Sequence, residues 1–314
     1  MMRSLYSAIT GLRNHQTAMD VIGNNIANVN TSGYKRERAS FATMLGQASQ
    51  GASAPSLATA GNPSTATIGG TNGITIGLGS VLGSVDKIMT QGSSSYTGKS
   101  TDMMIQGEGM FVVEIGPNTY YTRTGNFDLD ENGMLVDTNT GAKVQGYLNG
   151  DYALADNTND HFPSTTDYDM TTLSDIIIQQ GETYQIGGTD YTLESYGIDS
   201  KGVVTGVFTD AATGNSVSRE MFKLALATFN NEGGLNYEGN NFYTQSNNSG
   251  DAELGVAGSG DKGDIMTSYL EMSNVDLSQE FTDMIVTQRG FQANSRVITV
   301  SDTLLEELIN LKRS

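Results

Sequence analysis

The sequence predicts an α+β protein in which long N- and C-terminal heptad helices pair and enclose a β-rich core domain, with a second β-rich domain inserted in it. Apolar residues recur at spacings of four and three at both ends of the chain, whereas the middle alternates apolar and polar residues in short runs. A length of 314 residues suggests about two domains. We assign residues 1–30 and 276–314 to a terminal helical domain, 31–73 to a flexible, extended connector, 74–147 and 222–275 to the core β domain, and 148–221 to the inserted outer β domain.

The C-terminal helix is predicted by 37 residues, Asp276 to Lys312, that contain no proline and one glycine. Asp276 stands where a helix N-cap is expected, with Gln279 three residues later. The heptad row is Leu277, Phe281, Met284, Gln288, Phe291, Ser295, Ile298, Asp302, Leu305 and Ile309, and Val297, Leu304, Leu308 and Leu311 widen it. At about 1.5 Å per residue this helix would be roughly 55 Å long. Such a long stripe needs other helices to cover it.

The N-terminal helix is expected from about Ser4 to Val29. Its row is Leu5, Ile9, Leu12, Gln16, Met19, Gly23 and Ile26, flanked by Ala8, Ile22 and Val29. Asn24, Asn25, Asn28 and Asn30 are unusual in a helix, because their amides compete with the backbone. They indicate either helix termination, completed by a left-handed Gly33, or buried amides that fix the register of a multi-helix contact. An ordinary antiparallel helix pair under a globular domain also fits these rows.

Composition excludes several functions. Residues 41–275 carry a net charge of −19, against +3 for residues 1–40 and −2 for residues 276–314. This acidic middle argues against nucleic-acid binding, since it offers no basic surface to phosphates. The chain has no cysteine and two histidines, His15 and His161, which argues against thiolate or histidine metal sites. We expect no membrane insertion, and no cleaved signal peptide, because the N-terminus lacks a continuous apolar core.

Three short motifs mimic ligand sites. Asp128-x-Asp130-x-Asn132-Gly133 copies the first half of a calcium loop, but its twelfth position is Asn139, so a turn between strands fits better. Gly258-x-Gly260-x-x-Gly263 lacks the strand and helix of a dinucleotide site. Gly98-Lys99-Ser100 lacks the earlier glycine of a phosphate loop. We therefore expect no catalytic residue, no cofactor and no metal.

Two groups of runs carry a specific resemblance. They are Met19–Asn28 with Thr31, Gly33, Tyr34 and Lys35, and Glu271–Leu277 with Met284–Phe291 and Asn294. Both resemble the terminal signatures of the bacterial flagellar rod and hook (axial) proteins. Ile105–Val112, Tyr121–Phe127 and Val144–Tyr147 also resemble the core β domain of that family.

The resemblance implies a structural subunit whose terminal helices line an inner tube. We expect a hook protein, a flexible joint that couples motor torque to the filament, because of Gln145-Gly146-Tyr147, the Asn274–Leu277 run and the acidic insertion. A distal-rod subunit is the alternative, since the chain is short for a hook protein. Expected partners are other copies of the chain, rod, hook-cap and hook–filament junction proteins, and the flagellar export apparatus. The expected location is the bacterial flagellum, reached by export without a cleaved signal peptide.

The residues expected at the interface between subunits lie on the two terminal helices. They are Leu5, Ile9, Leu12, Met19, Ile22, Asn24, Asn25, Ile26, Asn28, Leu277, Phe281, Met284, Gln288, Phe291, Ile298, Leu305, Leu308 and Ile309. Two other classes stay open on the residues alone: a secreted β-domain hydrolase and a coiled-coil interaction protein that forms no filament.

Overall fold

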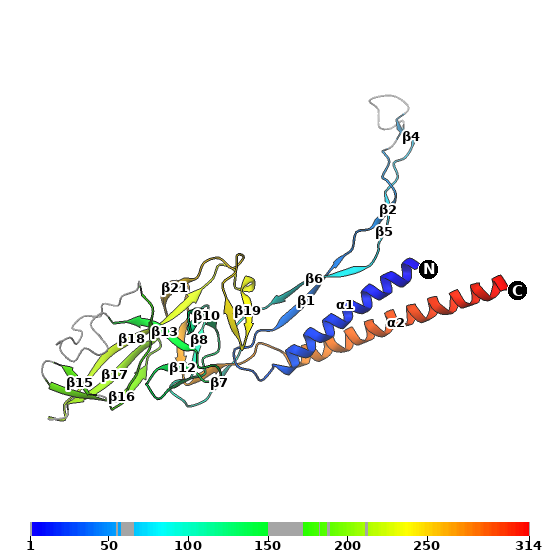
Figure 1. Cartoon of the computed structure of the whole chain (residues 1–314). Coiled ribbons are helices and arrows are strands. Elements are labelled where there is room, and N and C mark those ends of the chain that lie inside the picture. Colours follow the sequence, from blue (N-terminus) through cyan, green and yellow to red (C-terminus); the bar gives the residue numbers. More distant parts are fainter. Residues whose placement is uncertain are drawn as a thin grey trace. The chain divides into compact units, whose positions relative to one another are not determined.

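A computed structural model of the chain describes residues 2–54, 56–57, 66–149, 172–181, 183–186, 189–210 and 213–313. In the order of the chain, an N-terminal helix precedes a β-rich body and a C-terminal helix follows it; Figure 1 labels these elements. The chain divides into two compact units, each described here by itself. The helical unit comprises Met1–Ala27, Glu37–Lys87 and Asp276–Ser314, and the β unit comprises Asn28–Arg36 and Ile88–Val275.

The helical unit contains α1 (Met2–Ala27) and α2 (Leu277–Arg313). Asp276 caps α2, as predicted, because its Oδ1 accepts hydrogen bonds from the backbone amides of Ser278 at 2.8 Å and Gln279 at 3.4 Å. The Gln279 side chain does not complete a capping box; its Nε2 donates to Asp283 one turn later. Beyond α1, Gly33 adopts the predicted left-handed conformation, with φ +69°.

A two-stranded ribbon completes the helical unit. The strands are β1 (Glu37–Thr43), β2 (Gln47–Gln50), β3 (Ser56–Leu57), β4 (Ala66–Ile68), β5 (Ile74–Ile76) and β6 (Ser80–Lys87). They pair antiparallel as β1 with β6, β2 with β5 and β3 with β4. Residues 31–73 were expected to form a connector, and β1 to β4 lie within that range. The ribbon is fixed to α1 where Asn14 Nδ2 donates to Ser80 Oγ at 2.7 Å.

The β unit is built on a 13-stranded sheet, whose main path runs β15-β16-β17-β18-β13-β9-β10-β20-β19. These strands are β9 (Met110–Ile115), β10 (Asn118–Thr122), β13 (Lys143–Leu148), β15 (Thr183–Ile186), β16 (Thr189–Ile198), β17 (Val203–Asp210), β18 (Ser216–Thr228), β19 (Asn236–Gly239) and β20 (Phe242–Thr244). Four more strands belong to the sheet but lie off this path: β11 (Phe127–Leu129), β12 (Leu135–Asp137), β14 (Ser174–Asp175) and β21 (Glu253–Val256). Two pairs are separate: β8 (Met103–Gln106) with β22 (Asp264–Thr267), and β7 (Ser94–Tyr96) with β23 (Tyr269–Glu271).

The sheet is buried on both faces in the region where β9 pairs with β18. Successive side chains of a strand point to opposite faces. Phe111 and Val113 of β9 therefore join one buried cluster, and Met110 and Val112 join the other. Met110–Val113 therefore forms a stretch of β9 that is buried on both faces.

Strand β18 spans the expected boundary between the inserted and core regions at residues 221 and 222. Its first part pairs with β17, and its second part pairs with β9, β13 and β21. The described strands of the inserted range, β14 to β17, therefore belong to the same sheet as the core strands.

The calcium-like motif forms the predicted turn, between β11 and β12. Asp130 Oδ1 accepts hydrogen bonds from the backbone amides of Asn132 and Met134, at 2.8 Å and 3.0 Å. Gly133 supplies the left-handed residue, with φ +74°. The carboxylate of Asp130 thus stabilises the turn itself.

Candidate assembly surface

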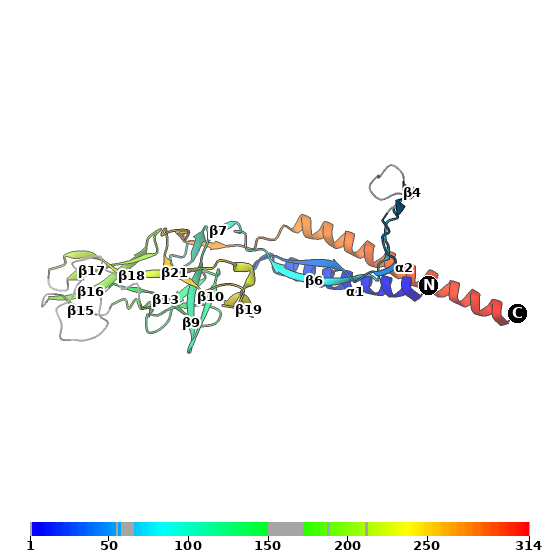
Figure 2. The same cartoon turned by 90° about the horizontal axis from the view of Figure 1, so that it is seen from above.

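The two helices of the helical unit run antiparallel in a defined register. Its contacts are Asn25 with Glu280, His15 with Gly290, and Gly11 with Asn294. In each pair the two residue numbers add up to 305. Residue n of α1 therefore lies level with residue 305 − n of α2, and Figures 1 and 2 both show α1 beside α2.

Two glycines, one on each helix, lie where α1 and α2 touch. A Cβ added to Gly11 would stand 2.5 Å from Asn294 Nδ2, and one added to Gly290 would stand 2.6 Å from His15 Cε1. Both glycines thus allow a side chain of the partner helix to approach the backbone. The buried apolar residues of α1 are Ala8, Ala18 and Ile22. The residues of the predicted row, such as Ile9, Leu12 and Met19, each follow one of these positions by one residue in the sequence. They therefore lie beside the contact with α2 and not at its centre.

The predicted interface residues differ in exposure. Ile22 and Asn25 are buried. Half-buried are Leu5, Leu12, Met19, Ile26, Asn28, Met284, Phe291, Ile298 and Leu305. Exposed are Ile9, Asn24, Leu277, Phe281, Gln288, Leu308 and Ile309. Asn28 belongs to the β unit, and the remaining residues of the set belong to the helical unit.

Asn25 connects three elements of the helical unit. Its side chain is 1% exposed. Its Nδ2 donates to the Glu37 carbonyl of β1 at 2.8 Å and to Glu280 Oε2 of α2 at 3.2 Å, while its Oδ1 accepts from the Glu37 amide at 2.9 Å. Since both ends of the amide are hydrogen-bonded, its burial carries no penalty for unpaired polar atoms. Asn25 fixes the register of α1 against α2 within one chain.

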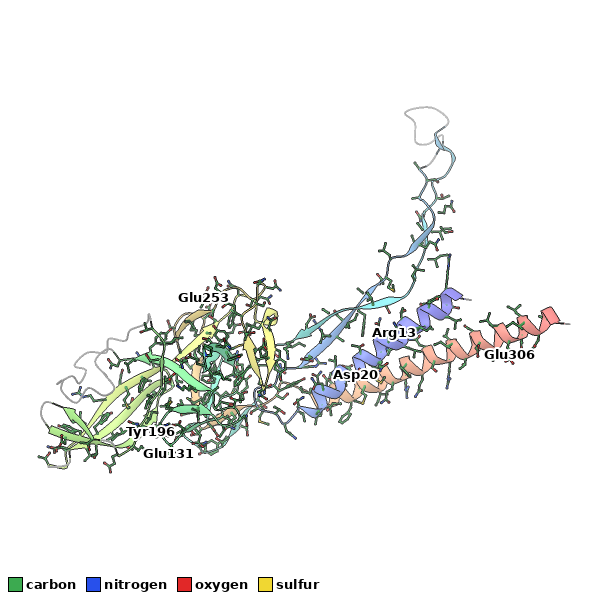
Figure 3. All side chains as sticks on the ribbon, viewed as in Figure 1. Arg13, Asp20, Glu131, Tyr196, Glu253 and Glu306 are labelled. Atoms are coloured by element: carbon green, nitrogen blue, oxygen red, sulfur yellow. The ribbon has the colours of Figure 1, made fainter. Side chains whose placement is uncertain are left out.

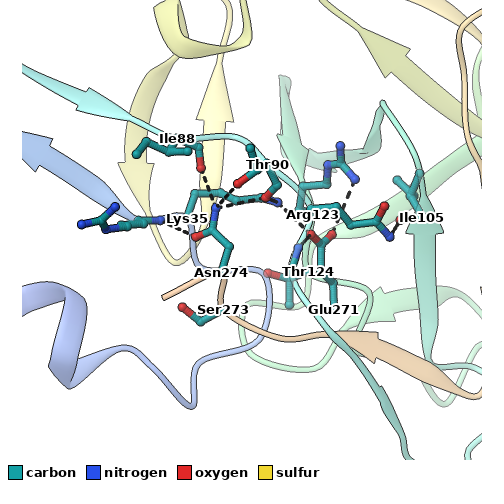
Figure 4. Close-up of polar contacts among 12 residues, drawn as sticks. Lys35, Ile88, Thr90, Ile105, Arg123, Thr124, Glu271, Ser273 and Asn274 are labelled. Atoms are coloured by element: carbon teal, nitrogen blue, oxygen red, sulfur yellow. Dashed lines mark hydrogen bonds and ion pairs between the residues drawn. The ribbon is translucent and has the colours of Figure 1, made fainter. Parts of the chain in front are cut away.

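In the β unit, a buried charged cluster joins the two chain segments that make up the unit (Figure 4). Lys35 Nζ lies 2.7 Å from Glu271 Oε1, and the two side chains are 1% and 0% exposed. Arg123 Nη1 lies 3.5 Å from Glu271 Oε2 and donates to the Gly107 carbonyl at 2.9 Å. One carboxylate therefore faces two buried cations. Burial lowers the pKa of Lys35 from its ordinary value, and the Glu271 carboxylate opposes this shift.

Backbone contacts surround this cluster. Lys35 Nζ also donates to the Thr90 carbonyl at 2.9 Å, and the Gly92 amide donates to Glu271 Oε1 at 2.8 Å. Asn274 Nδ2 donates to the carbonyls of Ile88 and Thr90, and its Oδ1 accepts from the Arg36 amide at 2.7 Å. The segments around residues 35, 90 and 271–274 are thus tied together by polar contacts.

Sequence reasoning missed the charged cluster. Lys35, Arg123 and Glu271 are far apart in the chain, so no local spacing connects them. The available signal was that Lys35 and Glu271 both lie inside the signature runs at the ends of the chain. A charged residue in such a run is a candidate for a buried ion pair.

The comparisons with known proteins agree along the whole chain. Residues 5–35 match the family described as "Flagella basal body rod protein", residues 104–206 match "Flagellar hook protein FlgE/F/G D1 domain", and residues 266–311 match "Flagellar basal body rod FlgEFG protein C-terminal". The flagellar basal-body rod protein FlgG of Bacillus subtilis is 42% identical over 314 residues, covering 100% of both chains. The chain belongs to the flagellar rod and hook family.

Hook proteins of the family are also similar to the chain. The flagellar hook protein FlgE of Borreliella burgdorferi is 30% identical over 455 aligned positions, covering 99% of this chain and 100% of that protein. The corresponding protein of Treponema pallidum is 30% identical over 477 positions, covering 100% of both. The expected membership of the rod and hook family is therefore confirmed.

The rod and hook family is structural rather than enzymatic, and its members polymerise with themselves and with other flagellar components. The chain is accordingly a component of the flagellar basal body or hook. Among the described residues, no group of three or more histidines and carboxylates could hold a metal ion. None of the described helices has a stretch long and apolar enough to span a membrane.

Proposed function

We propose that this chain is a subunit of the distal flagellar rod and that it polymerises into a helical tube through its terminal helices. The end-to-end match to the FlgG rod protein carries this proposal, since 314 aligned positions span both chains completely. The alignments to the FlgE hook proteins run over 455 and 477 positions, so hook relatives fill many positions where this chain has none.

The exposed apolar residues of the helices support polymerisation. Phe281 is 51% exposed, Val286 64%, Val300 57% and Ile309 60%. Burying a large apolar side chain contributes roughly 1.5–3 kcal/mol, so neighbouring subunits would supply a stabilisation that one copy lacks. A head-to-tail contact between different surfaces does not close on itself, and it generates a filament.

The hook is the second candidate. Its support is the resemblance of Gln145-Gly146-Tyr147 and Asn274–Leu277 to hook proteins, together with the two hook relatives. A hook subunit would form a flexible joint that couples motor torque to the filament. In such a joint the terminal helices of neighbouring subunits would keep their contacts, while the β units of those subunits would slide past one another.

The shape of the polymer distinguishes these candidates. The purified full-length chain is concentrated until it polymerises, and the product is imaged by electron microscopy. A straight, stiff tube is expected for a rod subunit. A curved polymer would instead assign the chain to the hook, and a defined small oligomer by light scattering would contradict both assignments.

The partners would be other copies of the chain, rod, hook-cap and hook–filament junction proteins, and the export apparatus, which would export the chain without cleaving a signal peptide. Helices without tertiary partners are marginally stable, so the termini would be largely disordered before assembly. Amide exchange on the monomer tests this proposal. Strong protection of residues 5–26 before polymerisation would contradict it.

A further inference from the structure

An apolar ridge runs along the second half of α2. By the register of the pair, the α2 residues beyond 303 lie past residue 2, where α1 begins. Its members are Val297, Val300, Leu304, Leu308 and Leu311, with exposed fractions of 43%, 57%, 46%, 50% and 72%. The spacings of three, four, four and three place them on one side of the helix. We call this set the C-terminal ridge. Contiguous exposed apolar surface of this kind marks an interaction site.

A complementary face lies on the first half of α1. Tyr6 is 63% exposed and Ile9 is 38% exposed, and Arg13 follows four residues later on the same side. We call these three residues the α1 outer face. By the register of the pair, Ile9 lies level with residue 296 of α2, and Leu308 lies twelve residues further along, or roughly 18 Å. The ridge around Leu308 therefore cannot cover Ile9 of its own chain.

The charges of the two surfaces are complementary. Glu307 lies within the C-terminal ridge, three residues after Leu304 and four before Leu311. Arg13 lies within the α1 outer face, and neither charged side chain forms a salt bridge in the described part of the chain. Figure 3 shows Arg13 on α1 and Glu306, the neighbour of Glu307, towards the end of α2. Each surface is an apolar row with one charge, and the two charges have opposite signs.

We infer that the C-terminal ridge packs on the α1 outer face of a second copy, with Glu307 beside Arg13 of that copy. This inference rests on the proposed polymerisation and specifies its contact. The two surfaces are different patches of one chain, so each copy keeps one free surface of each kind. Such a heterologous contact adds copies without closing.

Cysteine crosslinking tests the contact directly, because the chain has no cysteine of its own. Full-length Ile9→Cys and Leu308→Cys variants are mixed, polymerised and oxidised. A disulfide-linked dimer between the two variants is expected, since the residues would meet across the interface. Asp20→Cys mixed with Leu308→Cys is the matched control, because Asp20 is exposed on the other half of α1.

Polymer without a 9–308 crosslink would overturn this contact and leave the proposed function standing. Crosslinking of Leu308→Cys with itself, at the expense of the mixed product, would point to a symmetric α2–α2 contact and also overturn it. A chain that stays monomeric at every concentration would refute both polymerisation and the contact. Equal crosslinking at residues 20 and 9 would count against the register.

Charge reversal supplies a second measurement. Arg13→Glu and Glu307→Arg should each raise the concentration needed for polymerisation, by about fivefold for an ion pair near 1 kcal/mol. The double variant restores an opposite-charge pair and should return to within about twofold of the original chain. Failure of the double variant to recover, while its β unit remains folded by circular dichroism, would contradict the pairing of residues 13 and 307.

Discussion

Replacing Glu271 by Gln should destabilise the β unit strongly. The Glu271 carboxylate faces Lys35 Nζ at 2.7 Å and Arg123 Nη1 at 3.5 Å, and the Lys35, Arg123 and Glu271 side chains are at most 2% exposed. Glutamine keeps the shape of the side chain but removes its charge, so two buried cations lose their shared counter-charge. Removing one partner of a buried ion pair costs about 3–5 kcal/mol. The folding equilibrium constant should fall by roughly a hundredfold to several thousandfold.

Urea unfolding followed by tyrosine fluorescence measures this effect, since the chain has 14 tyrosines and no tryptophan. The matched control is Asp128→Asn. It breaks the pair between Asp128 and Lys99, whose side chains are 52% and 38% exposed, and it should cost at most about 1 kcal/mol. A Lys35→Met/Glu271→Gln double variant should lose less than the sum of its single variants. If Glu271→Gln proves no more harmful than the control, the cluster does not stabilise the fold as argued.

Three other substitutions probe separate features. Burial raises the pKa of Glu232, so the folded state favours its protonated form; Glu232→Gln should increase stability at neutral pH, and urea midpoints should show this gain vanish below the unfolded pKa of about 4.3. Asn25→Ala should destabilise the assembled helical unit by about 1–3 kcal/mol, because it leaves polar atoms of Glu280 and Glu37 with fewer partners; faster amide exchange in α1 and α2 of the polymer would reveal it, and unchanged exchange would argue against a role of Asn25 in fixing the register. Gly33→Ala should cost more than about 1 kcal/mol, since φ is +69° and the new Cβ would stand 2.9 Å from the Thr124 amide; an unaltered melting temperature would contradict this.

The sequence predicted both terminal helices and their heptad period, because that signal is local and repeats over many turns. The sequence did not predict which residues of each helix contact the other helix. The predicted rows consist of large apolar residues, whereas the α1 residues shown in contact with α2 are Gly11, His15 and Asn25. A glycine, a histidine and an asparagine contribute little to a hydrophobic pattern.

The β regions were predictable where strands are buried and poorly predictable where they are exposed. Met110–Val113 is short, apolar and buried on both faces, so its sequence indicates a strand. The ribbon strand β2, Gln47–Gln50, is fully exposed and pairs through its backbone. Pairing through the backbone requires no pattern of apolar side chains. The composition of this alanine-, serine- and glycine-rich segment therefore predicts a connector and not a strand.

The link between Lys35 and Glu271 also has a mechanical consequence. Lys35 belongs to the first segment of the β unit, Asn28–Arg36, and Glu271 belongs to its second segment, Ile88–Val275. A pulling force on either segment would therefore be shared with the other through the buried ion pair. The two segments, which are far apart in the sequence, would then resist extension together.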